Sequence, residues 1–255
     1  MKIVTSLAND TVKAVRALHQ RKARMESGLF LAEGLKIVAE AVELGFEPVI
    51  LLHGEGAAGH PVLERAAARA GQRLVVTQQI LEKICRRDNP QTVLGVFEQH
   101  FAELSDLSAG GVLIGLEAVR DPGNLGTIIR TADAAGAAGM ALIGDCCDPY
   151  SVEAVRATMG SIFAVPIVRV GAEAFLAWRK RWTGRVVGTL LSATTDFRAV
   201  DYSGPTMILL GNEQAGLTPS LAAACDVAVK IPMRGRADSL NLAVAAGVML
   251  YAAIS

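Results

Sequence analysis

The strongest constraint on the fold is an alternation of short apolar runs with helical segments over residues 112–254. Runs such as 112–116, 139–143 and 206–210 contain almost no polar residue. Strands that are apolar at every position are buried on both faces, as in parallel sheets covered by helices. We therefore expect an α/β fold in which residues 106–255 form a parallel-sheet domain.

The first part of the chain predicts a smaller α/β domain over residues 1–105. Helices are expected over 10–28, 29–45, 60–71 and 78–87, with strands over 48–54, 73–77 and 92–99. Residues 101–111 lose this periodicity and gather Ser, Asp and Gly, which places the linker there.

The composition favours a protein that lies in the cytoplasm and contains no membrane segment. The 255 residues are 51% hydrophobic, and 25 Lys and Arg balance 25 Asp and Glu, so any contact with nucleic acid must be a local patch. The start lacks the apolar core of a signal peptide, and the run from Ala243 to Ile254 is too short to span a bilayer. Four scattered cysteines show no metal-ligand spacing, which predicts a metal-free protein with reduced thiols.

Three loops at predicted strand ends carry more polar residues than a turn needs. They contain "RDPGNLGTIIR" from Arg120, "GNEQAGL" from Gly211 and "IPMRGRADSLN" from Ile231. Taken singly, each loop has a simple structural explanation: Asn124 or Ser239 as a helix N-cap, or Glu213 facing water. Ligands of open parallel sheets bind beyond the carboxyl ends of strands, so three such loops together indicate a binding site.

Common nucleotide-binding and hydrolase motifs are absent. The sequence contains no GxGxxG, GxxxxGK[ST], GxSxG or HExxH pattern. A nicotinamide-dependent oxidoreductase, considered because of the parallel sheet, needs a phosphate-binding glycine loop near the start of its domain. That loop is missing here.

Together, the three loops resemble the motifs of the SpoU/TrmH family of RNA ribose 2′-O-methyltransferases, in the SPOUT superfamily. The first motif is matched by Asn124, Gly126, Arg130 and Ala132, the second by "LLGNEQAGL" and the third by "IPMRGRADSLNLAVAAGVMLY". The likeness runs from about residue 112 to the end and includes "DPYSVEAVRATMGSIFAVPI". The segments "LFLAEGLKIVAEAV" and "NPQTVLGVFE" are similar to the small substrate-binding domain that often precedes this family's catalytic domain.

The resemblance implies properties that periodicity alone would not show. It implies a sheet of five to six strands with a deep trefoil knot, S-adenosylmethionine as cofactor in the knot loops, and a homodimer formed through the C-terminal domain. The implied reaction transfers a methyl group to a ribose 2′-hydroxyl of ribosomal or transfer RNA. The alternative is a non-catalytic RNA-binding or ribosome-assembly protein that retains the fold.

The resemblance also assigns site residues. The cofactor-binding residues would be Thr189, Leu190, Leu210, Gly211, Asn212, Ile231, Met233, Ser239 and Leu240. We expect Gly211 to be a glycine because a cofactor lies against its backbone. The catalytic residues would be Asn124, Arg130, Glu213, Ser239 and Asn241, with Asn124 and Glu213 orienting Arg130 across a dimer or loop contact. Because a guanidinium does not readily lose a proton, Arg130 would fix a phosphate and polarise the hydroxyl.

RNA must also be held by its phosphates, and the N-terminal part offers a basic patch. The candidate RNA-binding residues are Lys13, Arg16, Arg21, Lys22, Arg24 and Arg156, with Arg86 and Arg87 as secondary candidates. A solvated helix face is the structural alternative for the patch. Aromatic residues make up only 5% of the chain, so shape and phosphate contacts should dominate over base stacking.

Overall fold

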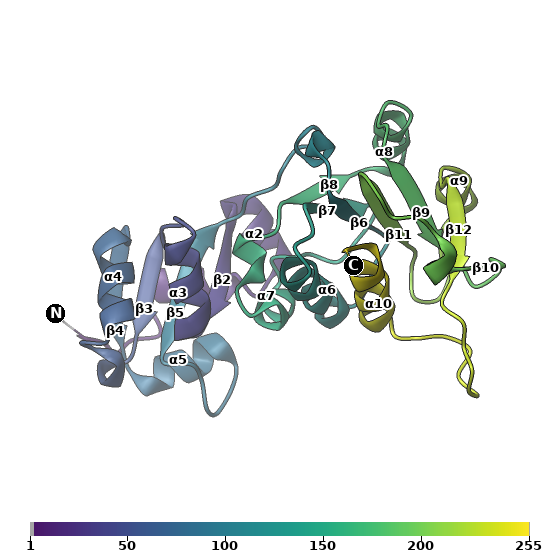
Figure 1. Cartoon of the computed structure of the whole chain (residues 1–255). Helices are drawn as coiled ribbons and strands as arrows, with labels where there is room; N and C mark the ends of the chain where they lie inside the picture. Colours follow the sequence, from purple (N-terminus) through teal and green to yellow (C-terminus); the bar gives the residue numbers. More distant parts are fainter. Residues whose placement is uncertain (1–2, 255) are drawn as a thin grey trace. The chain divides into compact units, whose positions relative to one another are not determined.

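The computed structural model describes residues 3–254 and divides into two compact units (Figure 1). One unit comprises the residues up to Gln99 together with Asp148–Ala164. The other comprises His100–Cys147 and the residues from Val165 onward. The segment Asp148–Ala164 lies within the stretch that resembles the methyltransferase domain, yet it packs with the N-terminal unit.

The N-terminal unit is a five-stranded mixed sheet, counted over the described residues, in the order β1-β4-β3-β5-β2. Strand β5 is antiparallel to β3 and β2, and the other pairs are parallel. The strands are β1 (Ile3–Val4), β2 (Leu29–Glu33), β3 (Ile50–His53), β4 (Gln72–Val76) and β5 (Val93–Glu98). The helices are α1 (Asp10–Ala17), α2 (Arg21–Ser27), α3 (Leu35–Glu43), α4 (Pro61–Arg69), α5 (Gln78–Cys85) and α7 (Val152–Thr158).

Two helix predictions in this unit were wrong. Residues 29–33, expected to begin a helix, form strand β2, because they pair along their whole length with β5 and bury Phe30 and Leu31. The helix expected over 10–28 is divided into α1 and α2, and α2 ends at Gly28 in the left-handed conformation (φ 68°). Pairing with a distant strand outweighed the local helical period in the first case.

Residues 148–164 complete the core of this unit. Phe163, in a short 3-10 helix (Ser161–Phe163), contacts the rings of Phe30, Phe46 and Phe97 at centroid distances of 5.6, 5.1 and 4.9 Å. Tyr150 packs against Phe30 at a centroid distance of 4.6 Å. Removing the segment would expose this aromatic cluster, so the N-terminal unit depends on residues that lie far along the chain.

The C-terminal unit is a parallel sheet, as predicted, with the strand order β10-β12-β9-β11-β6-β7-β8 over the described residues. Its strands are β6 (Val112–Glu117), β7 (Gly139–Ile143), β8 (Ile167–Val170), β9 (Arg185–Thr189), β10 (Thr195–Asp196), β11 (Thr206–Leu210) and β12 (Val227–Lys230). Its helices are α6 (Pro122–Ala134), α8 (Ala172–Arg179), α9 (Pro219–Ala223) and α10 (Leu242–Ile254). Short 3-10 helices lie at Glu55–Ala57, Asp106–Ala109 and Phe197–Ala199 in the two units.

The sheet has seven strands over the described residues, rather than the five to six that the resemblance implied. The difference includes β10, a two-residue edge strand that pairs with β12. The central strands β6, β7 and β11 are buried almost throughout, which explains their apolar sequence. The trefoil knot stays a prediction from the family. No helix in residues 3–254 is long and apolar enough to cross a membrane.

Candidate functional site

The three polar loops meet at the carboxyl ends of the parallel strands. Strands β6 and β11 are neighbours in register, with Leu116 opposite Leu210, so the loops that follow them begin side by side. Strand β9 pairs with β11 on the side away from β6, and β12 pairs with β9. The third loop follows β12. The parallel arrangement therefore collects motifs that are far apart in the sequence.

The side chain of Asn212 holds the second loop in its conformation through hydrogen bonds to the backbone. Its Oδ1 accepts the backbone N–H groups of Gln214 (2.9 Å) and Ala215 (3.1 Å), which forms a tight side-chain-capped turn. Its Nδ2 donates to the carbonyl oxygen of Ala118 at 2.9 Å, which attaches the loop to the end of β6. This residue thus fixes the position of Glu213 next to it.

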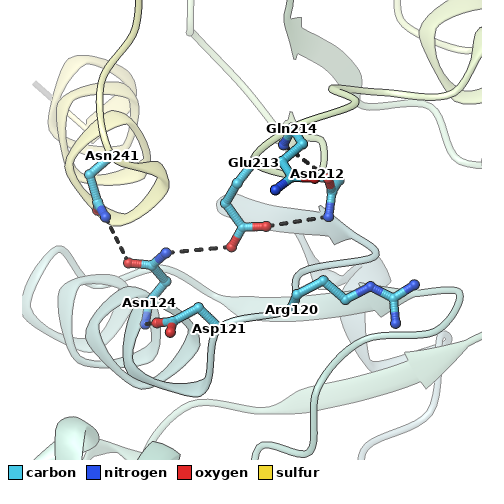
Figure 2. Close-up of a pocket in the computed structure, with 7 residues that line it drawn as sticks. All are labelled: Arg120, Asp121, Asn124, Asn212, Glu213, Gln214 and Asn241. Atoms are coloured by element: carbon cyan, nitrogen blue, oxygen red, sulfur yellow. Dashed lines mark hydrogen bonds between the residues drawn. The ribbon is translucent and has the colours of Figure 1, made fainter.

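A chain of hydrogen bonds connects all three loops (Figure 2). Asn241 Nδ2 donates to Asn124 Oδ1 at 2.9 Å, and Asn124 Nδ2 donates to Glu213 Oε1 at 3.4 Å. These side chains line a polar cavity of about 450 Å³ together with Arg120, Asp121, Asn212 and Gln214. Three of the five predicted catalytic residues are therefore in direct contact.

The residues that cap the helices beside this cavity are not Asn124 and Ser239, the N-caps that the sequence suggested. Asp121, not Asn124, caps α6, because its Oδ1 accepts the N–H of Asn124 at 2.6 Å. Asn241, not Ser239, caps α10, accepting the N–H of Ala243 at 2.9 Å. The Ser239 hydroxyl instead donates to Asp238 Oδ1 at 3.2 Å. Asn241 therefore serves both its helix and Asn124.

A larger cavity of about 680 Å³ lies beside the polar one and shares Asn212, Glu213, Gln214 and Asn241 with it. It is formed by the ends of β9, β11 and β12 and by the loop before α10. All nine residues predicted to bind the cofactor line it: Thr189, Leu190, Leu210, Gly211, Asn212, Ile231, Met233, Ser239 and Leu240. The structure brings the complete set together, and its cofactor role stays a prediction.

The chemistry of this lining fits S-adenosylmethionine. The volume is in the usual range for a small-molecule site. Leu191 and Leu240 line the cavity and are 76% and 39% exposed, so a ligand that covers them would gain apolar contact. Polar Thr189, Asn212 and Ser239 lie among apolar neighbours, so the cavity can accept an aromatic base together with a polar, charged group.

Gly211 has a steric reason to be glycine that the sequence did not reveal, and the expected cofactor contact stays a prediction. A Cβ on Gly211 would lie 2.0 Å from the carbonyl carbon of Gly216 and 2.2 Å from the backbone nitrogen of Leu217. The loop turns back on itself here, with Asn212 and Gly216 exchanging backbone hydrogen bonds of 3.1 and 2.9 Å. The chain's own turn therefore requires glycine at this position, whether or not a ligand is present.

Arg130 lies apart from the other predicted catalytic residues. It is exposed on α6 and does not line either cavity. Arg130 follows Asn124 by six residues, which places it about 120° around the helix and about 9 Å along its axis. Within one chain, Arg130 is therefore not oriented by Asn124 and Glu213.

The predicted RNA-binding residues divide into exposed and paired groups. Lys13 and Arg16 on α1, and Arg21 and Lys22 on α2, are exposed, with Lys13 next to Asp10 (3.2 Å) and Lys22 next to Glu26 (3.8 Å). Exposed pairs of this kind are weak and leave the lysines able to contact a phosphate.

Arg24 is different, because it is only 3% exposed. Its guanidinium donates from Nε (2.9 Å) and Nη2 (2.7 Å) to Asp148 Oδ2, and from Nη1 to the carbonyl of Leu18. Including Arg24 in the basic patch was therefore wrong, since this arginine is a buried structural residue. Arg156 is half-buried and donates to the buried carboxylate of Glu33 at 2.7 Å.

Sequence reasoning missed Glu117, the last residue of β6. Its side chain is buried, and Oε2 accepts the N–H of Thr218 at 2.8 Å, which anchors the far end of the second loop. An acidic residue that ends an otherwise apolar strand was the available signal. Nearby, burial raises the pKa of the Cys146 thiol, which contacts the carbonyl oxygens of Leu116 and Ile143.

The fold and the site together define an α/β protein with a ligand cavity at the carboxyl ends of its strands. The SpoU rRNA Methylase family matches residues 111–251, and the MRM3-like substrate binding domain matches residues 9–95. The chain therefore belongs to the SpoU rRNA methylase family, which confirms the resemblance seen in the sequence and, at the level of the family, the predicted class of activity.

Relatives match over the whole chain. The chain is 32% identical over 252 residues to the 23S rRNA (guanosine(2553)-2′-O)-methyltransferase RlmP of Bacillus subtilis, covering 98% of each protein. It is 35% identical to the 23S rRNA (uridine(2479)-2′-O)-methyltransferase of Streptomyces viridochromogenes, covering 93% and 86%. The solved structure of an AdoMet-bound rRNA methyltransferase from Sinorhizobium meliloti is similar with a TM-score of 0.92 at 49% identity, covering 99% and 97%.

Proposed function

We propose that this protein uses S-adenosylmethionine to methylate a ribose 2′-hydroxyl in ribosomal RNA, in the cytoplasm. The observation that carries the proposal is the hydrogen-bonded chain from Asn241 through Asn124 to Glu213, placed at the shared wall of the two cavities. The choice of ribosomal RNA rests on the relatives, whose names specify 23S rRNA.

The cavity lining would hold the cofactor, which supplies an electrophilic methyl group when bound. The task of the protein is then to align the attacking oxygen and to assist the loss of its proton. The amide groups of Asn124 and Asn241 would hold the hydroxyls of a ribose in the polar cavity, and the Ser239 hydroxyl would contribute from the wall of the larger cavity. Glu213 keeps Asn124 in orientation, and the proton passes to a phosphate or to water.

Arg130 would come from a second copy of the chain. Within one chain it does not line the cavity whose residues it is expected to join, so the catalytic set is incomplete in a monomer. A symmetric dimer that uses α6 at its interface would place Arg130 of each copy toward the cavity of the other.

An apolar helix face next to Arg130 favours this dimer. On α10, Val244, Tyr251 and Ile254 are 52%, 54% and 41% exposed and recur on one side of the helix. Helix α10 packs on α6 close to Thr131, whose Cγ2 would lie 3.5 Å from a Cβ placed on Gly247. A second copy that covers the apolar face would therefore approach the helix that carries Arg130.

Mixing two inactive variants tests the shared site. Arg130→Ala and Glu213→Ala should each abolish methyl transfer, and Arg130→Ala should leave cofactor affinity nearly unchanged. Refolding or coexpressing them together should restore about a quarter of wild-type activity, since half of random dimers are mixed and each has one intact site. No recovery in mixtures shown to contain mixed dimers would refute a shared site.

RNA recognition is assigned to the N-terminal unit, where the substrate-binding domain matches. Lys13, Arg16, Arg21 and Lys22 form its exposed basic surface on α1 and α2. Between these helices, His19 Nε2 lies 2.6 Å from the carbonyl oxygen of Ile84, two residues before the exposed Arg86 and Arg87, so further cations lie near the same junction. These groups would supply phosphate contacts without base specificity.

Two measurements test the function itself. Calorimetry should detect S-adenosylmethionine binding, and Leu240→Trp, which places a bulky ring at a partly exposed position of the cavity lining, should weaken it strongly. Ribose methylation should then be mapped in total RNA from cells with and without the protein. Loss of one mark in 23S rRNA supports the proposal. If the protein does not bind the cofactor and every methylation mark remains in cells that lack it, the non-catalytic RNA-binding alternative is favoured.

A further inference from the structure

Arg120 lines the polar cavity although the sequence motifs assign it no role. It shares the cavity with Asn124, Glu213 and Asn241, and its side chain is 62% exposed. Among the residues that line this cavity, it is the one cation, whereas Asp121 and Glu213 are acids. The chain's own charges there disfavour an RNA phosphate, except at Arg120.

The backbone before Arg120 is held in an unusual conformation. Ala118 has φ 50°, in the left-handed region that costs a non-glycine residue about 1 kcal/mol. Three contacts maintain this turn: Ala118 N–H donates to Ile143 (3.0 Å), Ala118 C=O accepts from Asn212 (2.9 Å), and Val119 C=O accepts from Cys147 (2.8 Å). The neighbouring loops thus determine where the Arg120 side chain begins.

The present partner of Arg120 is easily exchanged. Arg120 Nη1 lies 2.8 Å from Asp145 Oδ2, and these side chains are 62% and 70% exposed. An ion pair this exposed contributes at most about 1 kcal/mol. A phosphate offers the guanidinium two parallel charge-assisted bonds, which is the stronger arrangement.

The direction of the side chain fits a phosphate beside the ribose. Figure 2 shows Asn124 and Asn241 on one side of Glu213, while the Arg120 side chain runs to the other side. We propose that Arg120 binds a phosphate next to the methylated ribose and exchanges Asp145 for it when RNA arrives. This inference rests on the proposed function and adds a substrate-binding residue to it.

The test compares RNA affinity over a series of KCl concentrations, using a transcribed 23S rRNA fragment that the wild-type protein binds. Arg120→Gln should weaken binding about tenfold at low salt and reduce the slope of log K against log [KCl] by about 0.7–0.9, the value for one phosphate contact. Arg120→Lys should keep the slope with a smaller loss of affinity. S-adenosylmethionine affinity should stay within about twofold for both.

The chain offers two matched comparisons. Asp145→Asn removes the competing carboxylate, so RNA binding should be equal or tighter. Arg185→Gln breaks another surface pair, Arg185–Asp201, at the amino end of β9, and should change neither affinity nor slope.

Two outcomes would overturn the inference. One is an Arg120→Gln variant that binds RNA with the affinity and slope of Arg185→Gln. The other is an Asp145→Asn variant that loses as much RNA affinity as Arg120→Gln. The ion pair would then act by holding the loop that carries Arg120 in place, and Arg120 would not bind the phosphate itself. A fragment that binds without being methylated would count against the proposed function alone, since affinity and slope are measured without turnover.

Discussion

Asn241 donates a 2.9 Å hydrogen bond from Nδ2 to Oδ1 of Asn124, across 117 positions of sequence. The same Asn241 uses its Oδ1 to cap α10, and the same Asn124 donates to Glu213. Two amide side chains thus fix the positions of three separate loops relative to one another. Because an amide both donates and accepts, asparagine is suited to a chain of this kind.

Separating the two roles of Asn241 gives the first prediction. Asn241→Ala should lose about 1 kcal/mol of unfolding free energy with the helix cap, and should also lose methyl transfer. Asn241→Ser should keep the cap and most of the stability but still lose activity, since serine cannot reach Asn124. Urea unfolding and methyl-transfer assays on both variants check this. An active Asn241→Ser variant would show that the contact with Asn124 is dispensable.

Gly211→Ala should disorganise the second loop, because its Cβ would lie 2.0 Å from Gly216. We expect S-adenosylmethionine affinity to fall at least about tenfold, since Gly211, Asn212 and Glu213 all line the cavity. Gly235→Ala is the control, because a Cβ on Gly235 would meet no heavy atom within 4 Å and this residue does not line the cavity. Calorimetry measures both. Equal affinities would contradict the steric argument.

Arg24→Ala should destabilise the protein by about 3–5 kcal/mol, because it leaves Asp148 buried without its partner. Adding Asp148→Asn should recover part of this loss, since the unpaired charge is removed. Arg16→Ala, on the exposed face of α1, should change stability by less than about 0.5 kcal/mol. Urea unfolding distinguishes them. If Arg24→Ala were as stable as Arg16→Ala, the pair would not be buried in solution.

His19 should make stability depend on pH. Burial lowers its pKa below the ordinary value of 6.5, and the hydrogen bond between Nε2 and the carbonyl oxygen of Ile84 (2.6 Å) offsets only part of this. The unfolded chain therefore binds a proton more readily, so stability is greatest above pH 6.5 and falls as the pH drops from there toward the folded pKa.

The comparison of His19→Asn with wild type isolates this effect. Chemical unfolding at a series of pH values should show a smaller loss of stability on acidification in the variant than in wild type. Parallel curves for the two proteins would mean that other groups cause the pH dependence.

Much of the site could be predicted because its chemistry is local in sequence. Each motif follows a strand, and parallel strands bring their carboxyl ends to one edge, so the cofactor set converges as expected. The failures were at positions where a distant segment decides the outcome. Residues 29–33 became a strand because β5 pairs with them, and Arg24 became buried because Asp148, 124 positions further along the chain, pairs with it.

The sequence by itself determined the parallel α/β class and the three motif loops, because periodicity and motif spacing are properties of the chain. Its resemblance to the family supplied nine of the residues that line the large cavity. Only the tertiary structure decided that Gly211 is required by Gly216, that Arg130 lies away from Asn124, and that residues 148–164 complete the N-terminal core. Burial and hydrogen bonding depend on which atoms meet in space, and residues far apart in sequence supply those atoms.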